Sequence, residues 1–134
     1  MGTRDITAEQ FNDTITDNEI VLVDFWASWC APCRQSFPWM QAIGVSYEKQ
    51  GLTVVAVNLD QNSQDAAQFL AKFHPTFDVR FDPQGTSAEY FKVQGMPTSV
   101  IIDRHGRVRF THIGFRPADE AAYDHELRQV LAEK

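Results

Sequence analysis

Cysteine is scarce in this 134-residue chain, and its two cysteines lie in one short segment, at Cys30 and Cys33. Without a second pair, a structural zinc site, which needs about four ligands, has to recruit histidines. A stabilising disulfide is also disfavoured, because the loop it closes is too short to restrict the unfolded chain much. Redox chemistry is therefore favoured over a metal site or a staple. We expect no metal, and we expect solvent-exposed positions for His74, His105, His112 and His125.

Long apolar runs are absent as well. No stretch approaches the length that crosses a bilayer, and residues 1–4 have none of the apolar core of a secretory signal. Positive charge is in deficit, with 12 Lys and Arg against 18 Asp and Glu, which argues against a nucleic-acid partner. Repeats and Gly/Ser linkers are also missing. With 43% hydrophobic residues, the sequence predicts a single domain over residues 1–134, and we expect a monomer.

Hydrophobic periodicity predicts alternating strands and helices, and hence an α/β fold with a mixed central sheet flanked by helices. The almost continuous apolar run over residues 20–26 is typical of a central strand covered on both faces. Further strands are expected over residues 52–59, 77–81, 100–102 and 108–113. Helices are expected over residues 7–17, 32–50, 63–73 and 86–91, and from Pro117 onward.

The predicted helix over residues 32–50 has features that the structure can test. Pro38 is expected to kink it, and Gly51 is expected to end it. A buried face is predicted to contain Phe37, Met40, Ile43, Val45 and Tyr47.

The two cysteines follow the first predicted central strand and stand at the start of this helix, with Ala31 and Pro32 between them. Free backbone N–H groups and the positive end of the helix dipole stabilise a thiolate at such a position. We therefore expect Cys30 to attack disulfides. Cys33, one turn into the helix, is expected to be shielded and to resolve the mixed disulfide.

Asp24 is the one polar residue in the apolar run over residues 20–26. Burial raises the pKa of a carboxyl group, which suits an acid/base that moves the proton of Cys33 during resolution. The alternative is a structural aspartate satisfied by backbone N–H groups. The catalytic interpretation is favoured, and it gains most of its weight from a family resemblance.

That resemblance is to the thioredoxin-fold thiol:disulfide oxidoreductases, and residues 26–34, Pro38 and residues 95–98 carry it. Residues 55–60, 81–85 and 101–106 resemble the TlpA/ResA/DsbE-like branch in particular. The resemblance implies a thioredoxin fold with an extra β/α element before a cis-proline, and the long interval between Cys33 and Pro97 leaves room for it. Two positions depart from the branch. Gln61, with Asp60 beside it, stands where members commonly have glutamate, and Asp24 is the thioredoxin-like choice where they often have asparagine.

The resemblance also implies roles for other site residues. Pro97 is expected to be the cis-proline that faces the cysteines, and the backbone of Met96 is expected to bond an extended client segment. Trp29 and Pro32 are expected to line the docking surface, whereas Trp26 continues the strand into the core. Ala31–Pro32 is close to the Gly-Pro of thioredoxin, which favours a potential nearer about −270 mV than the roughly −120 mV of the oxidant DsbA.

The implied function is reduction of protein disulfides in the periplasm or another extracytoplasmic compartment of a bacterium, often on the cysteines of apocytochrome c. The sequence leaves open whether a signal or anchor was trimmed. Client proteins with disulfides or thiols are the expected partners. An electron-donor protein is expected in place of a bound cofactor, because no Gly-rich dinucleotide fingerprint is present.

Two alternatives stay open. A general cytoplasmic thioredoxin is favoured by Asp24 and disfavoured by the extra element. A non-catalytic module that holds thiol clients is disfavoured because both cysteines are present.

Overall fold

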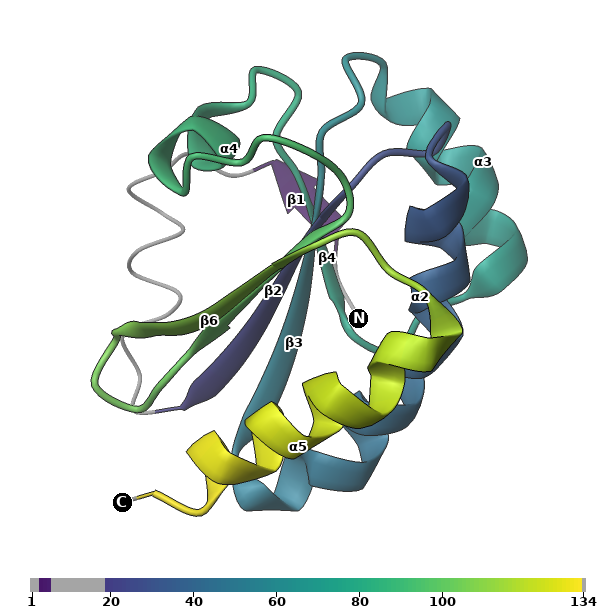
Figure 1. Cartoon of the computed structure of the whole chain (residues 1–134). Coiled ribbons are helices and arrows are strands. Elements are labelled where there is room, and N and C mark those ends of the chain that lie inside the picture. The colour runs from purple at the N-terminus through teal and green to yellow at the C-terminus, as the bar shows by residue number, and fades with distance from the viewer. Residues whose placement is uncertain (1–2, 6–18, 134) are drawn as a thin grey trace.

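The computed structural model describes residues 3–5 and 19–133, which form a six-stranded mixed sheet with helices on both faces (Figure 1). The strand order is β1-β4-β3-β2-β5-β6, in which β1 to β4 run parallel and β5 and β6 run antiparallel to their neighbours. The strands are β1 (Thr3–Asp5), β2 (Ile20–Trp26), β3 (Leu52–Asn58), β4 (Asp78–Phe81), β5 (Thr98–Ile102) and β6 (Val108–Ile113). The helices are α2 (Ala31–Tyr47), α3 (Ser63–Phe73), α4 (Thr86–Tyr90) and α5 (Glu120–Leu131), with 3₁₀ turns at Glu48–Gln50 and Pro117–Asp119.

The direction in which the chain moves through the sheet decides which face each helix covers. From β2 to β3 and from β3 to β4 the chain advances the same way, so right-handed crossovers put α2 and α3 on one face. The chain then returns across the sheet to β5, and α4 lies on the opposite face (Figure 1). Helix α5 joins α2 and α3, since Leu127, Val130 and Leu131 pack into the same apolar cluster as α2.

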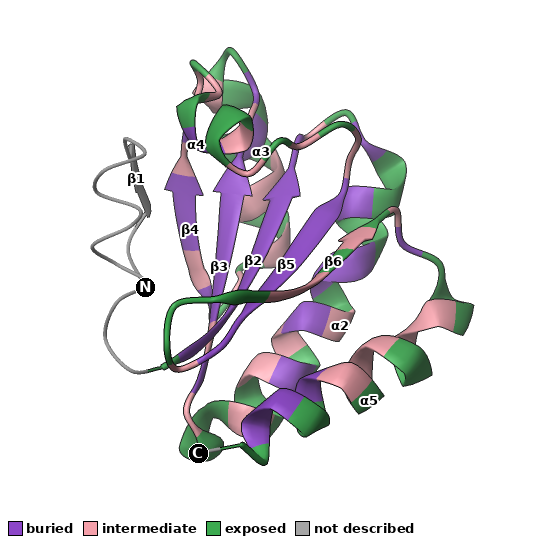
Figure 2. Cartoon of the chain, turned by 60° about the vertical axis from the view of Figure 1, so that its left-hand side comes forward, coloured by how far each residue is buried: buried purple, intermediate pink, exposed green. Residues whose placement is uncertain are grey.

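The core consists of two apolar clusters, one on each face of the central strands, of which β2 and β5 are buried throughout (Figure 2). Trp26 lies fully buried in the cluster under α2, as predicted, with its ring centroid 4.7 Å from that of Phe37. The opposite cluster is built from the alternate residues of β2, β3 and β5, with Phe91 and other residues from the α4 region against it. Asp24 projects from the same face of β2 as Leu22 and Trp26, which belong to the cluster under α2, so its side chain faces α2.

The fold class is the one predicted, including the extra element: β4 and α4 lie between α3 and the strand that follows Pro97. The predicted helix over residues 7–17 lies outside the described residues, and β1 was not predicted. Helix α2 runs through Pro38 and is followed by a 3₁₀ turn, after which Gly51 adopts a positive φ of 100°.

The predicted buried face of this helix was wrong at one end. Val45 is 61% exposed, because it follows the buried Ile43 by two residues and therefore lies on the opposite side of α2, and Tyr47 is half-buried. Several boundaries also differ from the prediction by one to three residues. Strand β5 begins two residues early, at Thr98, and Pro117 opens a 3₁₀ turn rather than α5 itself.

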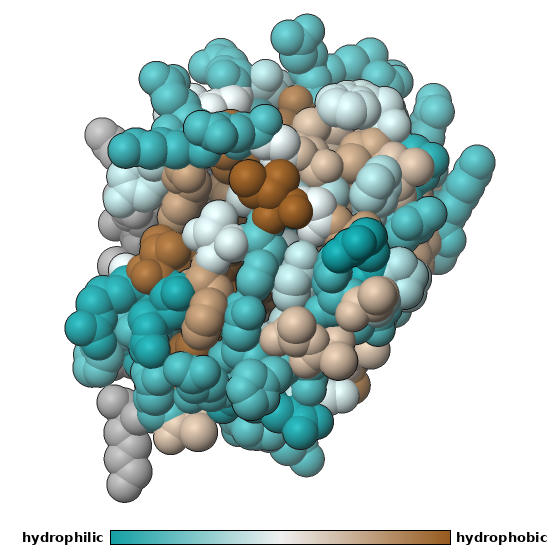
Figure 3. Space-filling view, in the orientation of Figure 1, coloured by the Kyte–Doolittle hydropathy of each residue, from teal (hydrophilic) through white to brown (hydrophobic). Residues whose placement is uncertain are grey.

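Hydrophilic residues predominate on the face of the molecule seen in Figure 3, where hydrophobic residues form only small patches. Among the described residues, no helix has both the length and the apolar character needed to cross a membrane. No group of three or more His, Cys, Asp or Glu side chains within residues 3–5 and 19–133 is arranged to hold a metal ion.

Candidate active site

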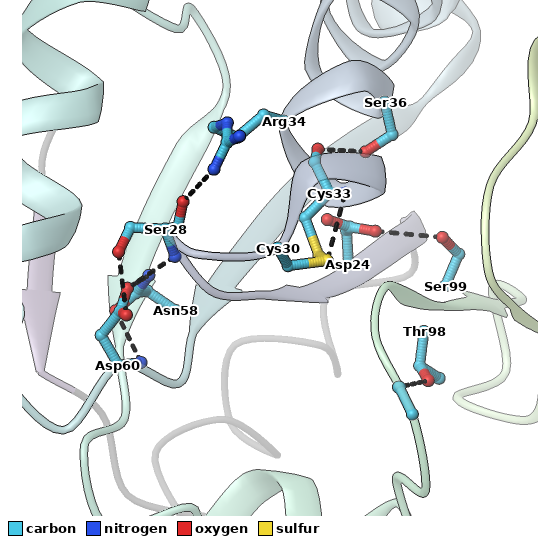
Figure 4. The surroundings of a disulfide bond; sticks show 11 residues. Asp24, Ser28, Cys30, Cys33, Arg34, Ser36, Asn58, Asp60, Thr98 and Ser99 are labelled. Atoms are coloured by element: carbon cyan, nitrogen blue, oxygen red, sulfur yellow. Dashed lines mark hydrogen bonds between the residues drawn. A yellow bond between two sulfur atoms is a disulfide. The ribbon is translucent and has the colours of Figure 1, made fainter.

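Cys30 and Cys33 form a disulfide at the N-terminus of α2, with their Cα atoms 5.3 Å apart (Figure 4). Cys30 is the N-cap of the helix, and its Sγ accepts a hydrogen bond from the Cys33 backbone N–H at 3.3 Å. Cys30 is 5% exposed, whereas Cys33 is completely buried. The sulfur at the helix terminus is therefore the better placed to meet an incoming disulfide, and the backbone already donates to it.

A buried carboxylate just beyond the neighbouring strand holds the loop that leads to Cys30. Asp60, just after β3, accepts hydrogen bonds from the Ser28 backbone N–H at 2.9 Å and from the Ser28 hydroxyl at 3.0 Å. Asn58 donates its side-chain amide to the same carboxylate at 2.7 Å. The sequence predicted no role for Ser28 or Asn58, and it matched Gln61 to the position where members of the branch commonly have glutamate. Gln61 is exposed, and the inward carboxylate is Asp60.

Arg34 has an exposed side chain, and it also holds this loop by donating a hydrogen bond to the Ser28 carbonyl. Beside it lies an open groove of about 650 Å³ between the Cys30 loop and α3. Its lining combines basic, acidic and aromatic side chains: Ser28, Arg34, Asp65, Gln68, Phe69, Lys72 and Phe73.

Asp24 is completely buried on the face of the sheet that α2 covers. The Ser99 hydroxyl donates to its Oδ1 at 3.1 Å, and its Oδ2 has no hydrogen-bond partner among the described residues. Desolvation by burial raises the pKa of Asp24 to about 8, and the hydrogen bond from Ser99 acts against this rise. The carboxyl group therefore changes its charge close to neutral pH, as an acid/base requires.

The segment from Gly95 to Thr98 forms the other predicted part of the site. The Met96–Pro97 peptide bond is cis, as predicted. The Gly114 N–H donates to the Pro97 carbonyl at 2.7 Å, and the Thr98 hydroxyl donates to the Gly95 carbonyl, so both ends of the turn are held. Pro97 is buried and Met96 half-buried, packed against the cluster that contains both cysteines.

The two residues expected on the docking surface are accessible. Trp29 is 70% exposed, and Pro32 is exposed at the start of α2. Their exposure is compatible with contact to a client.

One expectation for the histidines was wrong. His112 is half-buried rather than solvated: its Nε2 lies 2.5 Å from a carboxylate oxygen of Glu126, and its ring stacks on Tyr123 at 4.1 Å between centroids. These partners come from α5, so no local sequence pattern around His112 announces them.

The family described as thioredoxin-like matches residues 5–108, which span most of the chain and include both cysteines and Pro97. The chain belongs to this thioredoxin-like family. Among solved structures it is similar to a protein of Chlorobium tepidum assigned as the thiol:disulfide interchange protein DsbE. The two are 48% identical with a TM-score of 0.86, over 90% of this chain and 84% of that one.

Two curated relatives give the same picture. The thiol-disulfide oxidoreductase ResA of Oceanobacillus iheyensis is 35% identical over 88 residues, which are 66% of this chain and 46% of ResA. The thioredoxin-like protein YneN of Bacillus subtilis is 36% identical over 97 residues, which are 70% of this chain and 56% of YneN. The chain thus spans about half the length of the curated relatives it matches. These similarities place this thioredoxin-like protein in the TlpA/ResA/DsbE-like branch.

Proposed function

We propose that this protein is a thiol:disulfide oxidoreductase that reduces disulfides of client proteins through Cys30 and Cys33. The observation that carries the proposal is the disulfide at the N-terminus of α2, where the Cys33 N–H points at Cys30 Sγ and Asp24 is buried beneath the helix. The ResA and DsbE names of its relatives support the same activity.

The reaction starts from the dithiol. The Cys30 thiolate attacks one sulfur of the client disulfide, that disulfide breaks, and the other client sulfur leaves as a thiolate that takes a proton from water. A mixed disulfide now joins Cys30 to the client. The amide N–H groups at the start of α2 stabilise the Cys30 thiolate before the attack.

Resolution requires Cys33 to lose its proton in a place that water does not reach. Asp24, ionised, accepts that proton, and the Cys33 thiolate attacks the Cys30 sulfur. The mixed disulfide breaks, the second client sulfur leaves as a thiolate, and the Cys30–Cys33 disulfide forms. Two electrons have passed to the client, and a dithiol donor protein restores the enzyme by the reverse exchange.

The roles of the two cysteines can be separated by trapping. Cys33→Ser should accumulate a covalent complex with clients, because the mixed disulfide has no resolving thiol, whereas Cys30→Ser should form none. Non-reducing electrophoresis of the purified variants with a disulfide-bonded client measures this. Equal trapping by Cys30→Ser contradicts the assignment. Failure of the wild-type protein to accelerate insulin reduction by dithiothreitol favours a non-catalytic binding module.

We further propose an extracytoplasmic location and clients that include the cysteines of apocytochrome c, on the strength of the resemblance to the ResA and DsbE branch. The extra β4–α4 element disfavours a general cytoplasmic thioredoxin. Peptides with a Cys-x-x-Cys-His motif among the clients trapped by Cys33→Ser support the proposal. Efficient reduction of the protein by a flavoprotein thioredoxin reductase supports the cytoplasmic alternative.

A further inference from the structure

The surroundings of Asp24 are polar on one side only. In the sheet register Asp24 lies opposite Ala56 of β3 and opposite Ser99 of β5, and Ser99 in turn lies opposite His112 of β6. Residues that lie directly opposite on neighbouring strands project from the same face. A row of polar side chains therefore runs from Asp24 towards α5, whereas β3 offers it only a methyl group.

The hydrogen bond within this row distinguishes the two oxygens of the carboxylate. The Ser99 hydroxyl has one proton, and it is directed to Asp24 Oδ1 at 3.1 Å. Oδ2 is left without a partner among the described residues, although it is fully buried. In Figure 4 the oxygen bonded to Ser99 is turned away from the cysteine pair, and the other oxygen is on the opposite side of the carboxyl group.

We propose that Ser99 is a positioning residue for Asp24, which holds Oδ1, favours the ionised carboxylate and leaves Oδ2 as the atom that takes the proton of Cys33. This inference rests on the proposed function. The serine is 7% exposed and lies in a strand whose next three residues, Val100 to Ile102, are apolar and buried. A buried hydroxyl at this position costs free energy unless it is hydrogen-bonded, and Asp24 is the partner that the structure gives it.

Among the described residues around this row, Ser99 is the one that donates a hydrogen bond to the Asp24 carboxylate. Helix α2 brings Cys33 to the side of the sheet that Asp24 faces (Figure 4), and β3 contributes no titratable side chain opposite Asp24. His112 lies one strand further than Ser99 and is engaged by Glu126 and Tyr123 of α5. Within residues 3–5 and 19–133, no basic side chain forms an ion pair with Asp24. The Ser99 hydroxyl is therefore the group among the described residues that favours the ionised carboxylate and acts against the desolvation that raises its pKa.

The experiment follows the resolution step alone. Ellman's reagent converts the reduced protein to a mixed disulfide between Cys30 and 5-thio-2-nitrobenzoate, and attack by Cys33 then releases a second, coloured equivalent. The rate of this second phase is measured between pH 5 and 10 by stopped flow. Removal of the hydroxyl in Ser99→Ala should move the midpoint of the profile upward by about one pH unit, which lowers the rate on its acid side by up to about tenfold.

Matched variants separate positioning from packing. Ser99→Thr keeps the hydroxyl and should restore the wild-type midpoint, whereas Ser99→Val, which has the same shape without the hydroxyl, should behave like Ser99→Ala. Ser87→Ala is the control, because Ser87 is a completely buried serine that donates to the buried carboxylate of Asp82, outside the site. This control should lower stability and leave the midpoint in place.

The outcomes distinguish this inference from the function on which it rests. A second phase that is missing in the wild type, or that persists in Cys33→Ser, overturns the proposed exchange mechanism. A normal second phase whose midpoint is the same in wild type, Ser99→Ala and Ser99→Val overturns the role of Ser99 alone. An equal shift in Ser99→Thr and Ser99→Val also overturns it, because the effect then follows shape and not the hydroxyl.

Discussion

Two buried aspartates, Asp24 under α2 and Asp82 after β4, have similar burial but opposite surroundings. Asp82 is 2% exposed, and its carboxylate accepts the backbone N–H of Thr86 at 3.1 Å, the backbone N–H of Ser87 at 2.7 Å and the Ser87 hydroxyl. Asp24 is completely buried and accepts one hydrogen bond. The first carboxylate organises the start of α4. The second carboxylate has one donor, Ser99, and its Oδ2 has no partner among the described residues, so burial raises its pKa to about 8.

Asp60 shows that distance from the cysteines does not explain this difference. It is buried close to the Cys30 loop, yet Ser28 and Asn58 satisfy it as fully as Thr86 and Ser87 satisfy Asp82. Burial of an acid therefore does not identify a catalytic residue in this molecule. The distinguishing property is an oxygen without a partner, because such a group gains most from binding a proton.

The largest expected effect comes from Asp24→Asn. The amide cannot take the proton of Cys33, so turnover at pH 7 should fall by about 100-fold, a typical contribution of general acid–base catalysis. Insulin reduction with saturating dithiothreitol measures this fall. Turnover that matches the wild type from pH 6 to 9 contradicts an acid/base role and leaves Asp24 with a structural one.

The same variant should change how stability depends on pH. Between the ordinary carboxyl pKa of 3.8 and the folded value of about 8, the folded protein holds a proton that the unfolded chain has released. The free energy of unfolding of the oxidised wild type should therefore fall as pH rises through this interval, by on the order of a few kcal/mol, and level off above it. Urea denaturation at pH 5, 7 and 9 should show a smaller fall for Asp24→Asn and a more stable variant than the wild type at pH 9.

Asp82→Asn should have an intermediate effect on the free energy of unfolding, and it should lower this quantity where Asp24→Asn raises it. The carboxylate accepts from three donors, and an amide turns its own donors towards at least one of them. The free energy of unfolding should fall by about 1–3 kcal/mol, the usual cost of leaving a buried donor unsatisfied. Turnover per folded molecule and its pH profile should stay as in the wild type. Loss of activity in a fully folded Asp82→Asn protein shows that the two regions are coupled.

Structural features could be predicted from the sequence where a local pattern of residues specifies them, and not where they depend on contacts between distant residues. The apolar run of β2, the helix start at Cys30 and the interval that holds β4 and α4 are local patterns, and the structure confirms them. The partners of Asp24 and Asp60 are not local, because Ser99 lies 75 residues from Asp24 and Ser28 lies 32 residues from Asp60. Only the register between strands brings such residues together. His112 and Glu126 are also not predictable from a local pattern, because they meet only where α5 packs beside β6.

The smallest expected effect tests whether the helix terminus or Asp24 controls the Cys30 thiolate. The Cys33 N–H and the dipole of α2 act directly on Cys30 Sγ, so the rate of iodoacetamide alkylation of the reduced protein should have a midpoint below the value of about 8.5 for a free thiol. Asp24 acts only through its charge when ionised. Asp24→Asn should therefore lower the midpoint further by less than about one unit and simplify the titration to a single step, and Asp82→Asn should leave it unchanged.

A wild-type midpoint at or above about 8.5 removes the helix terminus as the source of activation. A downward shift in Asp24→Asn much larger than one unit transfers control of the nucleophile to the buried carboxylate.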